Sequence, residues 1–282
     1  MSIQKQPFLY KRQQFLISLV ACLKDSPSDT DLQKIVFSYC KKKELNFYDF
    51  MPYKFGAFST LLARDVDYLT DNNFLGKSEL ENIAIDEASI ETLRGNKLVR
   101  KTYKEYPFYA INSGIAHEVL SEYDLSIVAQ KRQELADDKQ ILFSVGYEGK
   151  SLESFICDLL LKNIKVLCDI RYNPQSRKAG FSQSTLKKVV EGAGIEYVHI
   201  PELGIEPKLR ISLESESDYV DLFVEYRKTF SNRESAIKRL CDIVINRNRI
   251  AIMCLEKDPA FCHRNIVKNY IAENYQINCE NL

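Results

Sequence analysis

The chain has 282 residues, of which 45% are hydrophobic and 28% charged, a composition typical of an ordinary globular protein with about two domains. Lys+Arg and Asp+Glu each number 39, so the net charge is zero, and any nucleic-acid contact must come from a local patch. No apolar run approaches the roughly 20 residues of a membrane span and no secretory signal is evident, so we expect a cytoplasmic protein with reduced cysteines and no membrane partner.

The first part of the chain is expected to be mainly helical. Three segments have apolar residues at helical spacing: 9–24, 30–43 and 58–70. A short aromatic run precedes the third segment, and the pattern resembles a winged-helix unit, which we expect within a domain covering 1–125. The third segment carries Arg64 against Asp65 and Asp67, a poor surface for phosphates. The unit is therefore expected to bind either DNA or a protein partner.

Residues 126–139 are polar and charged, and they are expected to link this domain to a second one, 140–282. In the second domain, short apolar segments predict buried strands: 141–145, 165–170, 196–200 and 249–254. Helical patterns lie between and after them: 151–163, 182–194, two within 217–246, and 263–275. Strands alternating with helices predict a three-layer α/β domain with a parallel sheet.

Polar side chains follow all four predicted strands. These residues are Tyr147 and Glu148, Asp169 and Arg171, Glu202, and then Glu256, Cys262, His263 and Arg264. In open parallel sheets, functional groups gather beyond the carboxyl ends of the strands. The sequence therefore predicts one polar, anion-handling cleft at this edge of the sheet.

Four stretches resemble a known family. They read SVGYEGKSLESF, VLCDIRYNPQSRKAGFS, IEYVHIPELG and CLEKDPAFCHRNIV, and together they span about 140–270. In order and spacing they are similar to the family called domain of unknown function 488, of which the last stretch is the most distinctive. The resemblance implies an α/β fold and a site at these stretches, and little about the reaction. The N-terminal segment also looks like a helical region seen in some two-domain proteins of that family.

Asp169 and Glu256 each follow a buried strand, so they form either a general acid–base pair or ion pairs with nearby arginines. Cys262 and His263 lie where a loop enters the last predicted helix. A thiol there has a lowered pKa and can act as a nucleophile, or it packs as a small apolar residue. We name all four as catalytic candidates.

Cys254, Cys262 and His263 are also conceivable metal ligands. Their Cys-x7-Cys-His spacing matches no common zinc module, so no metal site is predicted. No cofactor is required by any motif, because both standard nucleotide-binding loops are absent from the sequence.

The segment 171–188 holds five basic residues and no acidic one, together with two aromatic residues. Such a segment grips phosphates and stacks on bases, or it is a solvated loop. We expect phosphate contact. The predicted substrate-binding residues are Tyr147, Glu148, Arg171, Arg177, Lys178, Glu202 and Arg264.

The leading hypothesis is an enzyme that acts by acid–base chemistry on a phosphate-bearing substrate, a nucleotide or nucleic acid. The alternative is a non-catalytic sensor of such a ligand, for example a regulatory or defence-system component. A tightly bound ligand that stays unchanged favours sensing, whereas turnover that is lost in Glu256→Gln favours catalysis.

Overall fold

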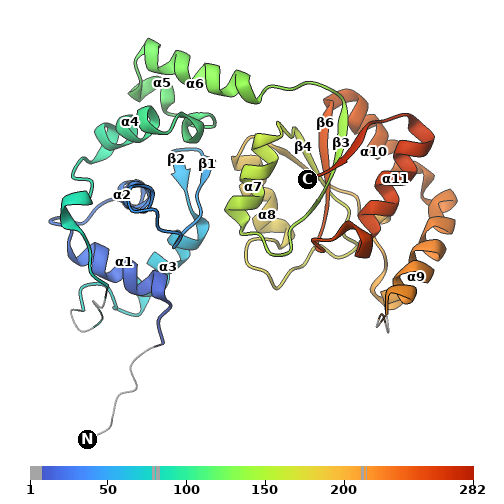
Figure 1. Cartoon of the computed structure of the whole chain (residues 1–282), viewed down its shortest axis with the longest axis horizontal. Coiled ribbons are helices and arrows are strands. Elements are labelled where there is room, and N and C mark those ends of the chain that lie inside the picture. The colour runs from blue at the N-terminus through green and yellow to red at the C-terminus, as the bar shows by residue number, and fades with distance from the viewer. Residues whose placement is uncertain (1–7, 78–79, 81–82, 211–212, 214) are drawn as a thin grey trace, which may run out of the picture. The chain divides into compact units, whose positions relative to one another are not determined.

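The computed structural model describes residues 8–77, 80, 83–210, 213 and 215–282. The chain divides into two compact units, Met1–Arg132 and Gln133–Leu282 (Figure 1). Helix α6, Glu122–Leu135, contains the boundary, so the first part of the predicted linker is helical. No helix in the described part of the chain is long and apolar enough to cross a membrane.

The N-terminal unit is mainly helical. Its helices and strands are α1 (Lys11–Ala21), α2 (Asp29–Lys42), β1 (Met51–Tyr53), β2 (Gly56–Phe58), α3 (Thr60–Asp71), α4 (Gly95–Glu105), α5 (Ala116–Val119) and α6. The start of α2 is fixed by Ser28, whose side chain accepts a hydrogen bond from the backbone N–H of Asp31. Phe15, Ile35, Val36, Phe37 and Leu62 lie in its fully buried core.

The winged-helix expectation is not shown by this unit. Strands β1 and β2 form an antiparallel hairpin between α2 and α3, so the hairpin precedes the third helix instead of following it. The sequence pattern predicted helix from Phe58 onward, but Phe58 closes the hairpin and the helix begins at Thr60. Side-chain alternation over three residues is too short to distinguish a strand from a helix start.

The C-terminal unit is built on a five-stranded, fully parallel sheet, as the sequence predicted. Its strands are β3 (Ile141–Gly146), β4 (Val166–Asp169), β5 (Glu196–His199), β6 (Arg249–Cys254) and β7 (Cys279–Asn281). They lie in the order β5-β4-β6-β3-β7. The edge strand β7 was not predicted, because its three residues carry no apolar alternation.

Helices cover both faces of this sheet, which gives the predicted three layers (Figure 1). They are α7 (Leu152–Leu161), α8 (Gln183–Gly192), α9 (Glu216–Lys228), α10 (Glu234–Arg247) and α11 (His263–Tyr275). Apolar side chains of α10 and α11, among them Leu240 and Ile271, pack in one cluster with Cys168 of β4 and Ile252 of β6. Helices α7 and α8 lie on the other side of the strands.

The order of the strands places a crevice between β4 and β6. The chain leaves β4 toward β5 at one edge, and it leaves β6 toward β7 at the opposite edge. Loops that diverge from neighbouring strands open a binding site at the carboxyl ends. Gly146 ends β3 beside this point, where an added Cβ would lie 1.9 Å from the carbonyl oxygen of Glu256. Only glycine permits the loop after β6 to pass so close.

Candidate functional site

A pocket of about 590 Å³ opens at the crevice between β4 and β6. The loop after β4 contributes Arg171, Tyr172 and Arg177, and the segment after β5 contributes Arg210. Further lining comes from three residues at or after other strand ends: Tyr147, Cys254 and His263. Within the described residues, the lining holds three guanidinium groups and no carboxylate. The segments after β3, β4, β5 and β6 therefore all contribute to this one pocket.

Asp169, the last residue of β4, is closed off from solvent by its partners. Its carboxylate is fully buried, and it accepts hydrogen bonds from Nε of Arg171 at 2.8 Å and from the hydroxyl of Tyr197 at 2.6 Å. A second nitrogen of Arg171 lies 2.5 Å from the other carboxylate oxygen. Asp169 was expected to be either an acid–base group or part of an ion pair. This arrangement matches the ion pair, because both carboxylate oxygens are already bonded and a substrate cannot reach them.

The remaining guanidinium nitrogen of Arg171 bonds two residues beside the pocket, Tyr147 and Phe181. Nη1 donates to the hydroxyl of Tyr147 at 3.0 Å and to the carbonyl of Phe181 at 2.9 Å. The Tyr147 ring stacks on Phe181 with centroids 4.3 Å apart. Burial acts to lower the pKa of Arg171, but the hydrogen bonds and charge of Asp169 raise that pKa above its ordinary value. Arg171 is therefore a permanent, fixed positive charge.

Glu256, two residues after β6, sits in a more open pair. One carboxylate oxygen lies 3.3 Å from Arg210, and the other accepts from the thiol of Cys254 at 3.2 Å. The side chains of Glu256 and Arg210 are 23% and 33% exposed. Burial acts to raise the pKa of Glu256, but hydrogen bonds, mainly from Cys262, and the charge of Arg210 together lower it. Glu256 is thus an ionised carboxylate that lines a neighbouring pocket of about 510 Å³, which shares Arg210 with the first pocket.

His263 begins α11 with its ring held between two groups. Nε2 lies 3.1 Å from the carbonyl oxygen of Ile170, so this nitrogen carries the hydrogen and donates it. Nδ1 then presents its lone pair to Arg210 at 3.2 Å and to the sulfur of Cys254 at 3.7 Å. The imidazole is oriented to accept a proton or to bind a cation.

Cys262 is fully buried, and burial raises the pKa of its thiol well above the ordinary value. Of the two interpretations of Cys262, this burial matches the packed thiol rather than an activated nucleophile. Cys254 lines the pocket in its place. The ligand atoms of Cys254, Cys262 and His263 all lie within 4.8 Å of one another. Spacing along the chain did not predict this cluster, because a strand end and a helix start meet in space.

Arg264 does not line the pocket. It is almost fully buried, and it donates to the backbone carbonyls of Glu256 and Lys257. Asp169, Arg171, Glu256 and Arg264, which all lie at or after predicted strand ends, therefore do not form one cluster. Asp169 pairs with Arg171, whereas Arg264 clamps the loop that carries Glu256. In this placement Arg264 positions the loop, which corrects its predicted role as an anion ligand.

The other predicted binding residues are spread around the loops. Glu148 accepts the backbone N–H of Lys257 at 2.9 Å, and Lys178 donates to the carbonyl of Tyr147 at 2.8 Å, so both join neighbouring loops. Arg177 is exposed at the pocket. The exposed Glu202 offers its backbone carbonyl to Arg233 and does not line the pocket.

Sequence reasoning missed Arg210 as a site residue. It ends a short 3-10 turn, Pro207–Arg210, in a stretch without apolar periodicity. The one available signal was its position in the long segment that follows the third predicted strand. Its pairing with Glu256 depends on how that segment folds back across the sheet.

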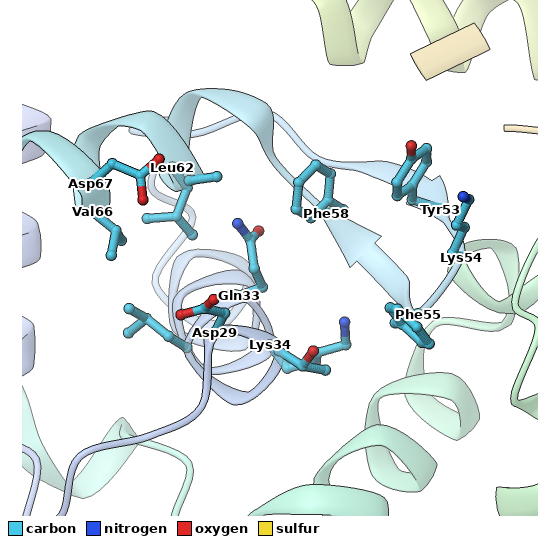
Figure 2. Close-up of a pocket in the computed structure, with 13 residues that line it drawn as sticks. Asp29, Gln33, Lys34, Tyr53, Lys54, Phe55, Phe58, Leu62, Val66 and Asp67 are labelled. Carbon is cyan, nitrogen blue, oxygen red and sulfur yellow. The ribbon is translucent and has the colours of Figure 1, made fainter. Parts of the chain in front are cut away.

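A second, separate pocket of about 280 Å³ lies within the N-terminal unit. Figure 2 shows Tyr53 and Phe58 of the hairpin on one side, Leu62 and Val66 of α3 on another, and Lys34 of α2 below. The Lys34 amine is buried and donates to the carbonyl of Ala57 at 3.3 Å. Burial lowers the pKa of Lys34 to about 8, against the opposing charge of Asp31.

The comparisons with known proteins bear on the C-terminal unit alone. Residues 151–271 match the model of a family described as Domain of unknown function DUF488. The searches of curated proteins and of solved structures found no significant match. The matched segment runs from the start of α7 into α11, and so it contains the loops after β4 and β6. The resemblance inferred from the four sequence stretches is thereby confirmed, and the C-terminal part of the chain is a domain of the DUF488 family.

Proposed function

We propose that the C-terminal unit is an enzyme that binds a phosphate-bearing substrate, a nucleotide or nucleic acid, in the pocket between β4 and β6. The observation that carries this proposal is the lining of the pocket, which places Arg171, Arg177 and Arg210 together without a carboxylate. Guanidinium groups present planar pairs of N–H donors that match phosphate oxygens.

The three arginines contribute differently to anion binding. Arg171 is held by Asp169, so it supplies a fixed charge rather than a mobile side chain. Arg210 keeps a buried Nε with no hydrogen-bond partner among the described residues. A buried donor without an acceptor costs free energy that an anionic ligand recovers. The exposed Arg177 is free to close over the ligand.

Aromatic rings favour a nucleotide over inorganic phosphate as the ligand. Tyr172 lines the same pocket with 47% of its surface exposed. A base stacks on such a ring with a gain of about 1–3 kcal/mol, whichever base it is. This arrangement supports recognition of a nucleoside phosphate.

The acid–base group of the proposed reaction is Glu256. Its carboxylate is ionised near neutral pH, and it can therefore accept a proton. His263 lies next to Glu256 in this site, with its Nδ1 beside Arg210 and Cys254. Asp169 is a positioning residue in this proposal, because its carboxylate is occupied by Arg171 and Tyr197.

Binding is tested by calorimetric titration of the full chain with ATP and with a short single-stranded oligonucleotide. The double variant Arg177→Ser/Arg210→Ser is expected to bind at least about tenfold more weakly, because each charge-assisted hydrogen bond contributes about 1.5–3 kcal/mol. The matched control is Arg247→Ser, since Arg247 is an exposed arginine that precedes β6 at the opposite end of the strands. Equal affinity of the double variant and the parent would contradict the proposal.

Turnover separates an enzyme from a sensor. Products of the bound nucleotide are followed by chromatography for the parent and for Glu256→Gln. The proposal expects turnover by the parent, and retained binding with at least about a hundredfold slower turnover in the variant. A ligand that the parent binds and leaves unchanged after long incubation would overturn the catalytic part and identify a non-catalytic sensor.

A further inference from the structure

The cluster of Cys254, Cys262 and His263 has properties that the substrate proposal does not use. Cys254 ends β6, Cys262 caps α11, and His263 is the first residue of that helix. All three side chains are buried, and their ligand atoms lie within 4.8 Å of one another. Two thiols and an imidazole at such distances form the kind of ligand set that Zn²⁺ prefers.

The separation of the ligand atoms fits a tetrahedral centre. The sulfur of Cys254 lies 3.7 Å from Nδ1 of His263. Around zinc, with Zn–S near 2.3 Å and Zn–N near 2.05 Å, tetrahedral ligands of these types lie about 3.6 Å apart. The observed distance is therefore the separation expected when both atoms bind one ion.

The orientation of His263 is also that of a metal ligand. Its Nε2 donates to the carbonyl of Ile170 at 3.1 Å, and this bond leaves Nδ1 with its lone pair on the side of the sulfurs. Metal-binding histidines characteristically donate their other ring N–H to a carbonyl or carboxylate, which fixes the ring and its tautomer.

The surrounding charges would be balanced with an ion in place. A divalent cation with two thiolates and a neutral imidazole carries no net charge, and the neighbouring pair of Glu256 and Arg210 is also neutral. Arg210 now donates to Nδ1 of His263 at 3.2 Å. With the cation on Nδ1, Arg210 keeps Glu256 as its partner and turns its remaining donors to the pocket.

We propose that Cys254, Cys262 and His263 bind one Zn²⁺ ion, with the fourth position open to the pocket. Cys254 and His263 line that pocket, so water or a substrate oxygen can reach the ion. Three protein ligands with an open position are typical of catalytic rather than structural zinc. The proposal does not depend on the substrate, because the ion is held by this chain alone.

The test uses the full chain purified under reducing conditions, with metal content measured by mass spectrometry before and after dialysis against a chelator. The stripped protein is then titrated with Co²⁺, which reports thiolate ligands by a charge-transfer band and tetrahedral geometry by intense d–d bands. The expected result is one ion per chain and both spectral signatures.

Variants decide which residues hold the ion. Cys262→Ser and His263→Gln are each expected to weaken Co²⁺ binding by at least about tenfold, since even loss of an outer-sphere partner has an effect of that size. The control is Cys168→Ala, because Cys168 is an equally buried cysteine on the neighbouring strand β4 and is outside the cluster. Circular dichroism reports whether each variant folds. If a variant does not fold, the Co²⁺ absorption spectrum of the parent protein shows whether thiolates bind the ion.

Three results would overturn the proposal. They are a folded parent that binds neither Zn²⁺ nor Co²⁺, undiminished binding in the folded ligand variants, and a disulfide between Cys254 and Cys262 that persists under reducing conditions. None of them affects the nucleotide titration of Arg177→Ser/Arg210→Ser. Failure of the metal site and failure of the phosphate pocket are therefore distinguished.

Discussion

Strands β4 and β6 are neighbours, and the carboxyl end of each carries a carboxylate paired with an arginine, but the two pairs differ in their exposure to water. Asp169 and Arg171 have side chains that are 0% and 6% exposed, and the carboxylate is also bonded to Tyr197. Glu256 and Arg210 are 23% and 33% exposed and border the pockets at this edge of the sheet.

The difference shows how the same chemical pair serves two purposes. A fully buried pair must satisfy its own donors and acceptors, and it thereby becomes rigid and closed to ligands. A half-open pair exchanges partners with solvent or substrate at a small cost. In the proposed function, Asp169–Arg171 therefore shapes the pocket and Glu256–Arg210 takes part in the chemistry. Burial, not residue type, decides between the two roles.

The largest expected effect comes from breaking the closed pair. Asp169→Asn leaves the buried guanidinium of Arg171 without its counter-charge, which is expected to lower the free energy of unfolding by about 3–5 kcal/mol. Chemical denaturation measures the change. The matched control is Glu196→Gln, because Glu196 is half exposed in its pair with Arg247, and its loss is expected to cost about 0.5 kcal/mol. A similar small loss in Asp169→Asn would remove the distinction between the two strand ends.

Lys34 of the N-terminal unit is a buried charge of a different kind from Arg171. Its amine donates to a backbone carbonyl, whereas Arg171 donates to a carboxylate. Its folded pKa of about 8 lies below the ordinary 10.5, so between these values the unfolded chain binds more protons and stability rises with pH. Lys34→Met removes this dependence. The difference between variant and parent in unfolding free energy is expected to change by about 3 kcal/mol from pH 7.5 to pH 10.5.

The control for this measurement is Lys97→Met, because Lys97 is exposed on α4 of the same unit. Its difference from the parent should stay constant over the same interval. A constant difference for Lys34→Met as well would mean that burial does not shift the pKa of Lys34.

The smallest expected effect concerns the open pair. The pKa of Glu256 is lowered in the folded chain, so its ionised form stabilises the fold above the ordinary value of 4.5, and this contribution is lost as the pH falls through the lowered value. Glu256→Gln should therefore be less stable than the parent at pH 7 by no more than about 1 kcal/mol. Denaturation at several pH values should show the gap closing on acidification. A gap that widens toward acid would reverse the assigned direction of the pKa shift.

Most of the C-terminal fold could be predicted from the sequence because its strands are buried on both faces. Continuous apolar runs such as RIAIMC predict β6 at Arg249–Cys254, and the loops around them contain the recognisable family stretches. The hairpin of the N-terminal unit was less predictable. Each of its strands has three residues, so tertiary packing against α2 and the turn Pro107–Ala110, rather than local pattern, determines it.

Residue type predicted which side chains lie at the strand ends, but not which of them remain exposed to solvent or to a ligand. Arg264 and Arg177 are the same residue at similar positions after strands, yet one is buried against carbonyl groups and the other is exposed at the pocket. That outcome depends on how closely the loops pass one another. At Gly146, for example, the loop after β6 passes so close that no side chain would fit. This closeness depends on two segments far apart in the sequence, so neither segment predicts it alone.

The order of the strands also governs how the chain can fold while it is being made. Strand β3 is the first strand of the parallel sheet to leave the ribosome. Its neighbours are β6 and β7, which are synthesised much later; Ile141, for example, pairs with Arg249. By contrast, β4 can pair with β5 as soon as α8 has emerged. Until the chain is almost complete, β3 therefore presents Phe143 and Val145 on an unpaired apolar strand. An interruption of synthesis before residue 249 would release a fragment with an aggregation-prone strand, and without Cys254 or His263.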